Sequence, residues 1–347
     1  MAKRDYNLLG PDGVRAVETG LAAAEWYHSE VPRKVMKQLM QRSDGPALRD
    51  TALLYALMIS FATAGVLLWP SAWSLPFWLA YGVLYGSASD SRWHETSHGT
   101  AFKTAWMNAV VYQIACFMIV RNPVSWRWSH ARHHTDTVIV GRDPEIVAMR
   151  PPALFRIVLN VFGILDAVSG WKRMVLNAMG KLDAEEITYI PESEHHKVAK
   201  VAQIWVLIYA ATILTALLSS SILPLMLIGL PRLYGAWHHV MAGILQHAGL
   251  ADNVIDHRLN SRTVYMNPIS RFIYWNMNYH VEHHMFPMVP YHRLPDLHAA
   301  IKHDLPAANP SIFAAYREVI PVLLRQLTYH DDFLTRALPA TAKPYQP

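Results

Sequence analysis

The hydrophobic pattern of the chain begins with two apolar stretches that are separated by a short turn. Residues 52–69 carry no charged side chain, and the apolar pattern resumes over residues 75–89, after Pro70. About 20 mostly apolar residues are needed for a helix to span a bilayer. We therefore predict a helical hairpin that crosses the membrane twice.

A second pair of apolar stretches follows in the second half of the chain. It runs over residues 202–219, turns near residue 220 and returns through residues 223–230 and 235–249. Arg232 interrupts the returning stretch, so we expect part of this helix to face protein rather than lipid. The two pairs together predict an all-α integral membrane protein with four transmembrane helices in two hairpins.

The distribution of basic residues predicts the orientation of these helices. Residues 1–50 contain eight Lys or Arg and residues 91–200 contain thirteen, whereas the turns at 70–74 and 219–221 contain none. Segments with Lys and Arg close to the ends of the spans stay on the cytoplasmic side of a membrane. We therefore expect both termini and the central loop to face the cytosol, where they form a helical cap.

Two further apolar segments, residues 105–120 and 153–168, are less suited to spanning a bilayer. The first is short and contains Asn108, and the second is amphipathic and contains Asp166. We expect both to lie at the membrane surface as interfacial helices.

This topology divides the chain into three parts. Residues 1–50 form a cytosolic N-terminal segment, and residues 51–304 form the membrane domain with its metal site. Residues 305–347 form a C-terminal cytosolic helix and a tail. The tail is rich in proline from Ala337 onward, and we expect it to be disordered.

Composition supports a multi-pass membrane protein and excludes several other classes. Apolar residues make up 52% of the chain and charged residues 16%, well below the roughly 25% that is typical of soluble domains. The net charge is +5, but the basic residues form no stripe, so no nucleic-acid partner is predicted. Cys116 is the only cysteine, which excludes disulfides and cysteine-bound clusters within this chain.

Three clusters of histidine carry the candidate chemistry, with the spacings HxxxH, HxxHH and HxxHH. On a helix, residues three and four apart lie on one side, so each cluster presents several imidazoles in one direction. Three such clusters in one chain predict a metal site. The predicted ligands are His94, His98, His130, His133, His134, His280, His283 and His284.

His247 is predicted as a ninth ligand. It lies at the cytosolic end of the last predicted span, at the depth where His94 and His98 leave the second span. The neighbouring His238 and His239 are expected to pack between helices instead. Eight or nine imidazoles are too many for one ion, so we predict two ions; imidazole suits zinc, iron and copper alike.

Carboxylates are expected beside these ligands, because a metal-bound histidine usually donates its other N–H to a carboxylate or carbonyl. The acidic residues near the clusters are Asp90, Glu95, Asp136, Asp143 and Glu282.

A zinc protease is a competing hypothesis, because residues 94–98 read HExxH with Glu95 as the general base. Such a protease needs only one further ligand. The hypothesis therefore leaves six histidines of the other two clusters unexplained.

The three clusters resemble the histidine boxes of the membrane fatty acid desaturase and hydroxylase superfamily. The resemblance covers residues 52–302 and includes the order and gaps of the boxes, with the flanking sequences at residues 134–145 and 278–287. It implies a cytosolic non-haem di-iron centre, bound by the nine histidines, that uses O₂ and two supplied electrons to oxidise an unactivated C–H bond. It identifies no catalytic residue beyond the ligands.

The resemblance favours desaturation of a fatty acyl chain. Hydroxylation or ketolation of a lipid or carotenoid, and oxidation of a small polar metabolite, stay open as alternatives. Gly99 and Gly243 depart from the pattern of some relatives in the superfamily. The chain has no haem-binding His-Pro-Gly-Gly sequence, so a separate electron donor is expected, such as ferredoxin with its reductase.

Overall fold

The computed structural model describes residues 4–346. Residues 1–3 of the predicted N-terminal segment and Pro347 of the predicted tail lie outside the described residues. Within that range the regular elements are helices and no named strand occurs, which confirms the predicted all-α class. The first ten α-helices are α1 (Pro11–Glu18), α2 (Arg33–Leu39), α3 (Asp44–Leu68), α4 (Leu75–Val83), α5 (Ser89–Ser97), α6 (Ala105–Ile119), α7 (Pro123–Thr135), α8 (Leu154–Leu159), α9 (Ile164–Ala178) and α10 (Glu186–Tyr189). The remaining nine are α11 (His195–Leu218), α12 (Leu223–Leu227), α13 (Leu230–Gly235), α14 (Trp237–His247), α15 (His257–Asn260), α16 (Pro268–Tyr274), α17 (His280–Met285), α18 (Leu294–Ile301) and α19 (Ile312–Arg325).

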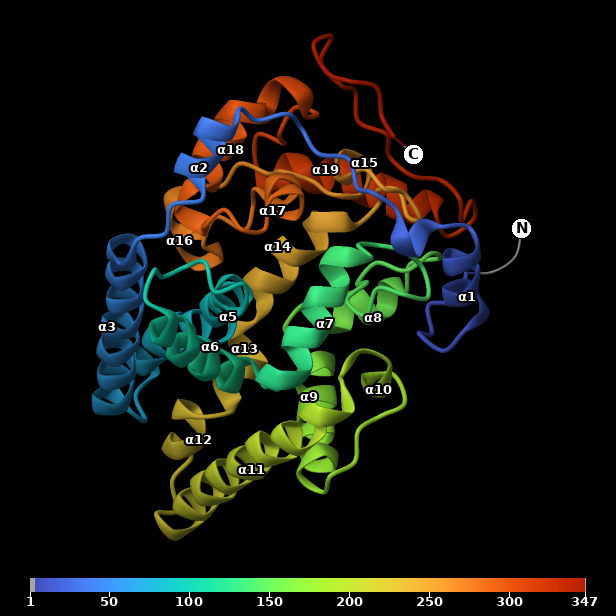
Figure 1. Ribbon diagram of the computed structural model, residues 1–347. Helices are drawn as coiled ribbons and strands as arrows, with labels where there is room; N and C mark the ends of the chain where they lie inside the picture. The colour runs from blue at the N-terminus through green and yellow to red at the C-terminus, as the bar shows by residue number, and fades with distance from the viewer. Residues whose placement is uncertain (1–3, 347) are drawn as a thin grey trace.

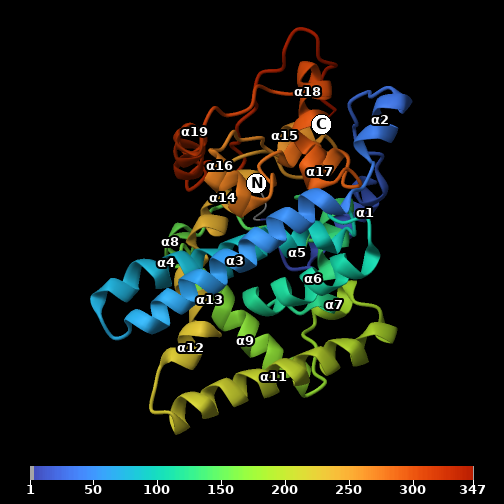
Figure 2. The same cartoon turned by 90° about the vertical axis from the view of Figure 1, so that its left-hand side faces the viewer.

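The helices that carry the histidine clusters lie in the middle of the molecule. Figure 1 shows α5, α7, α14 and α17 between α11 at the bottom and α18 at the top. In the view turned by 90°, α11 again lies at the edge of the molecule away from α18 (Figure 2).

Among residues 4–346, two helices are long and apolar enough to cross a membrane. They lie within the helical stretches Arg33–Leu68 and Glu192–Leu218, which contain α3 and α11. Large apolar side chains point away from the protein on α11, where Leu207, Leu217 and Leu218 are 69, 70 and 79% exposed. Such an apolar surface is suited to lipid.

The return segment of the first predicted hairpin is helical without a break. α4 continues through a π-helical turn over Leu84–Ala88 into α5, which carries the first histidine cluster. The turn lies against α13, and a Cβ atom at Gly235 would lie 1.7 Å from the carbonyl oxygen of Gly82. Glycine is therefore required at position 235 for the two backbones to approach.

The return segment of the second predicted hairpin is divided into α12, α13 and α14. The first break lies at Gly229, whose φ of +96° is a conformation that favours glycine. The continuous apolar pattern over residues 223–230 therefore does not form one helix, because Leu230 already belongs to α13. The four-span topology stays a prediction.

The two apolar segments between the hairpins differ from each other. Residues 105–119 form one helix, α6, which ends before Val120, whereas the predicted helix over residues 153–168 is divided into α8 and α9 at residues 160–163. Gly163 lies at this break with a φ of +66°. Their placement at the membrane surface stays a prediction.

The described part of the C-terminal tail packs against the protein, in contrast with the expected disorder. The guanidinium of Arg258 donates hydrogen bonds to the carbonyl oxygens of Lys343 and Pro344, each at 3.0 Å. The same guanidinium forms ion pairs with Asp256 and Asp304. The composition of the tail did not reveal this anchor, because the charged partners lie far away in sequence.

We expect an epitope tag inserted between Pro70 and Ser74 to be exposed on the side of the membrane opposite to a tag after Pro347. The reason is that the predicted spans place this turn outside and the C-terminus in the cytosol. Protease protection of the two tags in sealed vesicles measures their sides. Tags on the same face would contradict the topology.

Candidate metal centre

The three histidine boxes lie on three helices that converge on one region: at the ends of α5 and α7 and along the whole of α17. α7 begins at Pro123, where the side chain of Asn122 accepts a hydrogen bond from the backbone N–H of Val124. This capped start sets the helix so that its last turns carry His130, His133 and His134. α5 and α17 present the other two boxes, and His247 lies at the end of α14.

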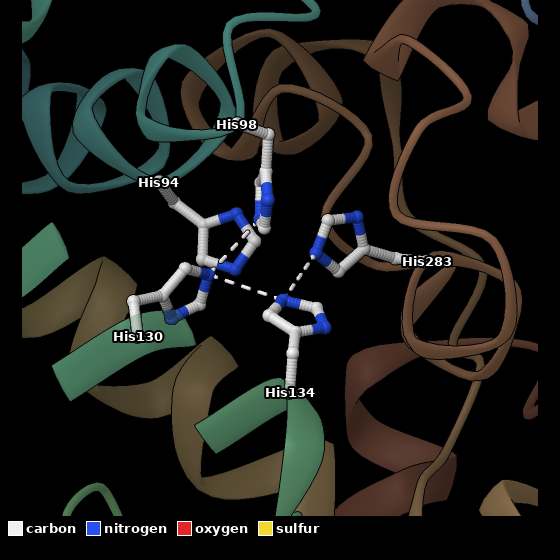
Figure 3. Close-up of side chains that lie close together, drawn as sticks. All are labelled: His94, His98, His130, His134 and His283. Atoms are coloured by element: carbon white, nitrogen blue, oxygen red, sulfur yellow. Dashed lines mark hydrogen bonds between the residues drawn. The ribbon is translucent and has the colours of Figure 1, made fainter. Parts of the chain in front are cut away.

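The structure brings all nine predicted ligands together in two adjacent clusters. In each, the possible ligand atoms lie within 4.8 Å of one another. The first cluster contains five histidines, which converge in Figure 3: His94, His98, His130, His134 and His283. The second cluster contains four: His133, His247, His280 and His284.

Helical geometry explains why each HxxHH box divides between the two clusters. Residues four apart are nearly in line on a helix, whereas the residue three along lies about 100° from the residue four along. His130 and His134 therefore share the first cluster, while His133 turns to the second. On α17 the arrangement is reversed, because His280 and His284 enter the second cluster and His283 the first.

The distances between imidazole nitrogens fit ligands of a common ion. Nε2 of His130 lies 3.1 Å from Nε2 of His98 and 3.2 Å from Nε2 of His134. In the second cluster, Nε2 of His280 lies 2.9 Å from Nε2 of both His247 and His284. Two imidazoles at right angles on an ion, with bonds of about 2.1 Å, have nitrogens about 3.0 Å apart. One N–H cannot serve two such contacts, so a cation satisfies the clusters better than hydrogen bonds do.

Carboxylates lie against the outer nitrogens of three predicted ligands. Nδ1 of His133 lies 2.9 Å from Oδ2 of Asp143, and Nδ1 of His94 lies 3.2 Å from Oε1 of Glu95. Both acids were predicted from the sequence. Nδ1 of His130 lies 3.1 Å from Oε2 of Glu145, which also accepts a hydrogen bond from the hydroxyl of Ser129.

Glu145 was missed by the sequence prediction, although it ends the Gly141-Arg-Asp-Pro-Glu145 segment that follows the second box. Glu145 lies farther along the sequence from that box than Asp143 does. The loop after α7 folds back and places the Glu145 carboxylate beside His130. Its position in this flanking segment was the signal that could have identified it.

Three other predicted acids do not contact a ligand, so these predictions were wrong. Asp136 accepts from Nε of Arg142 at 2.9 Å, and Asp90 pairs with Arg121 at 3.0 Å. The carboxylate of Glu282 contacts His298 and accepts from the hydroxyl of Thr263. Asp136 follows α7 as its C-cap and Asp90 lies one turn before His94 on α5, so it is their arginine partners, and not their position along the chain, that keep them from the ligands.

Burial keeps most of the ligand imidazoles neutral, the form that binds metal. Burial and the neighbouring imidazoles hold the pKa well below its ordinary value for His94, His98, His134, His280, His283 and His284. Burial also acts to lower the pKa of His133, but the Asp143 carboxylate outweighs it and raises this pKa to about 9. A metal ion at the second cluster would displace that proton.

His257 is a buried histidine beside the second cluster, and it belongs to none of the three boxes in the sequence. Its ring stacks on Trp26 at 4.2 Å between centroids and lies 5.1 Å from the ring of His284. His238 and His239 join neither cluster, as predicted, and Nε2 of His238 lies 3.1 Å from the hydroxyl of Ser270.

A cavity of about 450 Å³ lies beside both clusters. His94 and His130 of the first cluster and His133, His247 and His280 of the second form part of its wall. This places imidazoles of both clusters next to a space that can hold a small or aliphatic molecule.

Comparison with known proteins agrees with this arrangement. The family model for fatty acid desaturases matches residues 67–316, which include all nine histidines. The chain belongs to the fatty acid desaturase family. The predicted resemblance is thus confirmed.

Plant desaturases are among the similar proteins. A segment of 102 residues is 32% identical to an omega-6 fatty acid desaturase of the endoplasmic reticulum from Glycine max, over 28% of this chain and 26% of that protein. Two proteins of Arabidopsis thaliana match over a longer part of this chain. A chloroplastic sn-2 acyl-lipid omega-3 desaturase (ferredoxin) is 24% identical over 78% of this chain and 62% of its own length. An endoplasmic reticulum acyl-lipid omega-3 desaturase (cytochrome b5) is 23% identical over 79% of this chain and 74% of its own length. The chain thus spans less than two thirds of the first two relatives.

Proposed function

We propose that this protein is a multi-pass membrane oxidoreductase that uses O₂ to desaturate a fatty acyl chain at a di-iron centre on the cytosolic face. The observation that carries the proposal is the pair of adjacent histidine clusters, with five and four imidazoles, beside a cavity of about 450 Å³. Membership of the fatty acid desaturase family supports iron over the other metals that imidazole binds.

The nine histidines would hold two iron ions, one in each cluster, and the carboxylates would orient the ligands. Bound iron supplies the redox chemistry that activates O₂ and removes hydrogen from an unactivated C–H bond. Asp143 and Glu145 fix the rings of His133 and His130 by accepting from their outer nitrogens. The cavity wall positions the aliphatic chain next to His94 and His247.

Two electrons must be supplied for each double bond formed with O₂. The printed names of the two Arabidopsis thaliana relatives include ferredoxin and cytochrome b5. We propose a separate donor of this kind, such as ferredoxin with its reductase, that docks on the cytosolic side.

The geometry does not favour the protease hypothesis. Glu95 would be the general base, but it is fully buried and its carboxylate lies between His94 and His283, at 3.2 and 3.6 Å from their Nδ1 atoms. Burial raises the pKa of Glu95 to about 8. A general base needs access to the reacting water, and this position offers none.

Expression in a host that supplies ferredoxin and its reductase tests the proposed reaction. We expect mass spectrometry of the total lipids and free acids to show acyl chains that have lost two hydrogen atoms. The His98→Ala variant, which removes a predicted ligand, provides the matched background. Acyl chains that gain one oxygen atom, or unchanged chains beside a changed small polar molecule, would contradict desaturation of a fatty acyl chain.

A further inference from the structure

The wall of the cavity carries charged groups where a channel for hydrocarbon alone would be apolar. Asp90, Arg121, Arg232 and His239 all line it. The arginine at position 232 lies on α13 and is only 1% exposed. A buried charge is retained only where a partner or a function compensates for its loss of water.

The guanidinium of Arg232 has fewer hydrogen-bond acceptors among the described residues than it has N–H donors. Its Nε donates to the carbonyl oxygen of Ile119 at 3.2 Å, at the end of α6. Its Nη1 is buried and has no acceptor among the residues that the structure describes. No carboxylate of residues 4–346 forms an ion pair with it within 4.0 Å. The α8–α9 break allows this placement, because a Cβ atom at Gly163 would lie 2.4 Å from Nη1.

The neighbouring charges do not neutralise Arg232. Asp90 is used by Arg121, at 3.0 Å, and it also accepts from Nε1 of Trp93 at 3.0 Å. Nε2 of His239 lies 3.9 Å from the same carboxylate. The acids that act on Arg232 are thus Asp90, which is half-buried and shared with Arg121, and Asp166, which is exposed, and neither forms an ion pair with Arg232.

The remaining acids of the cavity wall are engaged elsewhere or exposed. Asp143 and Glu145 lie beside ligand histidines, and Asp252 pairs with Arg4 and Arg150. Asp166 is exposed. Arg232 is therefore a buried cation without an ion pair among the described residues, and the one acid of the cavity wall that also lacks an ion pair there, Asp166, is exposed.

We propose that the cavity binds an aliphatic substrate that carries a free carboxylate, and that this carboxylate pairs with Arg232 next to Arg121. The planar guanidinium presents parallel N–H donors that match the two oxygens of a carboxylate. An acyl chain held as a lipid ester or thioester has no such anion. The inference rests on the proposed function only for the reaction of the bound aliphatic chain, and not for the binding of its carboxylate.

The position of the arginines also places the carboxylate close to the histidine clusters. The guanidinium of Arg121 lies over the rings of Trp126 and Trp93, at 4.2 and 5.2 Å from their centroids. The ring of Trp93 in turn lies 5.7 Å from that of His94 and 5.3 Å from that of His130. One aromatic ring thus separates Arg121, the neighbour of Arg232 in the cavity wall, from two predicted ligands, which places the carbon that reacts near the carboxylate end of the substrate.

Binding to the full-length protein in detergent tests this inference without requiring activity. We expect decanoate or norleucine to raise the melting temperature, and their methyl esters to have no effect, because only the free acids carry the anion. A response to decanoate identifies a free fatty acid, and a response to norleucine alone identifies a small amino acid derivative. No stabilisation by either acid, or equal stabilisation by acid and ester, would overturn the proposal.

The Arg232→Gln variant tests the assigned residue. We expect it to bind the responding acid about 10- to 100-fold more weakly, the loss that removal of a charge-assisted hydrogen bond produces. The matched control is Arg142→Gln, because Arg142 pairs with Asp136 outside the cavity wall. Unchanged binding of the acid by Arg232→Gln would overturn the assignment. If this variant does not fold, the comparison of acid with ester on the unaltered protein still decides the question.

The binding experiment distinguishes a failure of the anion site from a failure of the proposed di-iron reaction. Acid-selective stabilisation would persist in protein that turns over no substrate, because Arg232 is not a predicted metal ligand. Conversely, desaturated lipid esters without acid-selective binding would support the reaction and refute the anion site.

Discussion

Replacing His133 by alanine is expected to abolish activity and to lower the iron content from about two ions per chain to about one. His133 is buried and belongs to the cluster of four, so three histidines would remain there, whereas the cluster of five would be complete. The measurement is iron per chain in the purified protein, together with O₂ consumption that depends on the electron donor.

The His196→Ala variant is the control for this prediction. His196 is exposed at the start of α11 and belongs to neither cluster, so its metal content and activity should match those of the unaltered protein. Membrane insertion should be normal in both variants, because neither substitution removes an apolar residue. Full metal content and activity in His133→Ala would refute the ligand assignment.

Replacing Asp143 by asparagine is expected to weaken metal binding at the second cluster by about 10- to 100-fold, the usual cost of losing the carboxylate that orients a ligand histidine. The carboxylate of Asp143 lies 2.9 Å from Nδ1 of His133 and accepts from the backbone N–H of Val138 at 2.8 Å. Asparagine can still accept a hydrogen bond but carries no charge. Competition with a chelator measures the affinity.

Asp136→Asn is the matched control, because the same change is made seven residues earlier in the same segment. Asp136 pairs with Arg142 and Arg132 and contacts no predicted ligand. We expect it to lower thermal stability without changing metal affinity. An equal loss of affinity in both variants would show that the effect arises from the loop rather than from His133.

The sequence by itself identified the candidate metal-binding region. The HxxxH and HxxHH spacings are local, and the helix places residues three and four apart on one side whatever the rest of the chain does. The sequence also located the two apolar helices that became α3 and α11, because the length of an uncharged run sets the length of a helix in lipid. His247 was found by its depth along a predicted helix, and the structure places it with His280 and His284.

Only the tertiary structure decided how the histidines divide, which acids serve them and where the helices break. The assignment of His130 and His133 to different clusters depends on which residues lie on each side of α7. One of these residues is His283, which comes from a helix about 150 residues after His134. Glu145 reaches His130 through a loop, whereas Asp136 turns to arginines, and the sequence pattern treats such nearby acids alike. The unmatched charge of Arg232 was visible in the sequence only as an interruption of an apolar run. Its meaning depends on long-range packing, because α6, α9 and α13 together enclose the guanidinium and leave it beside the cavity.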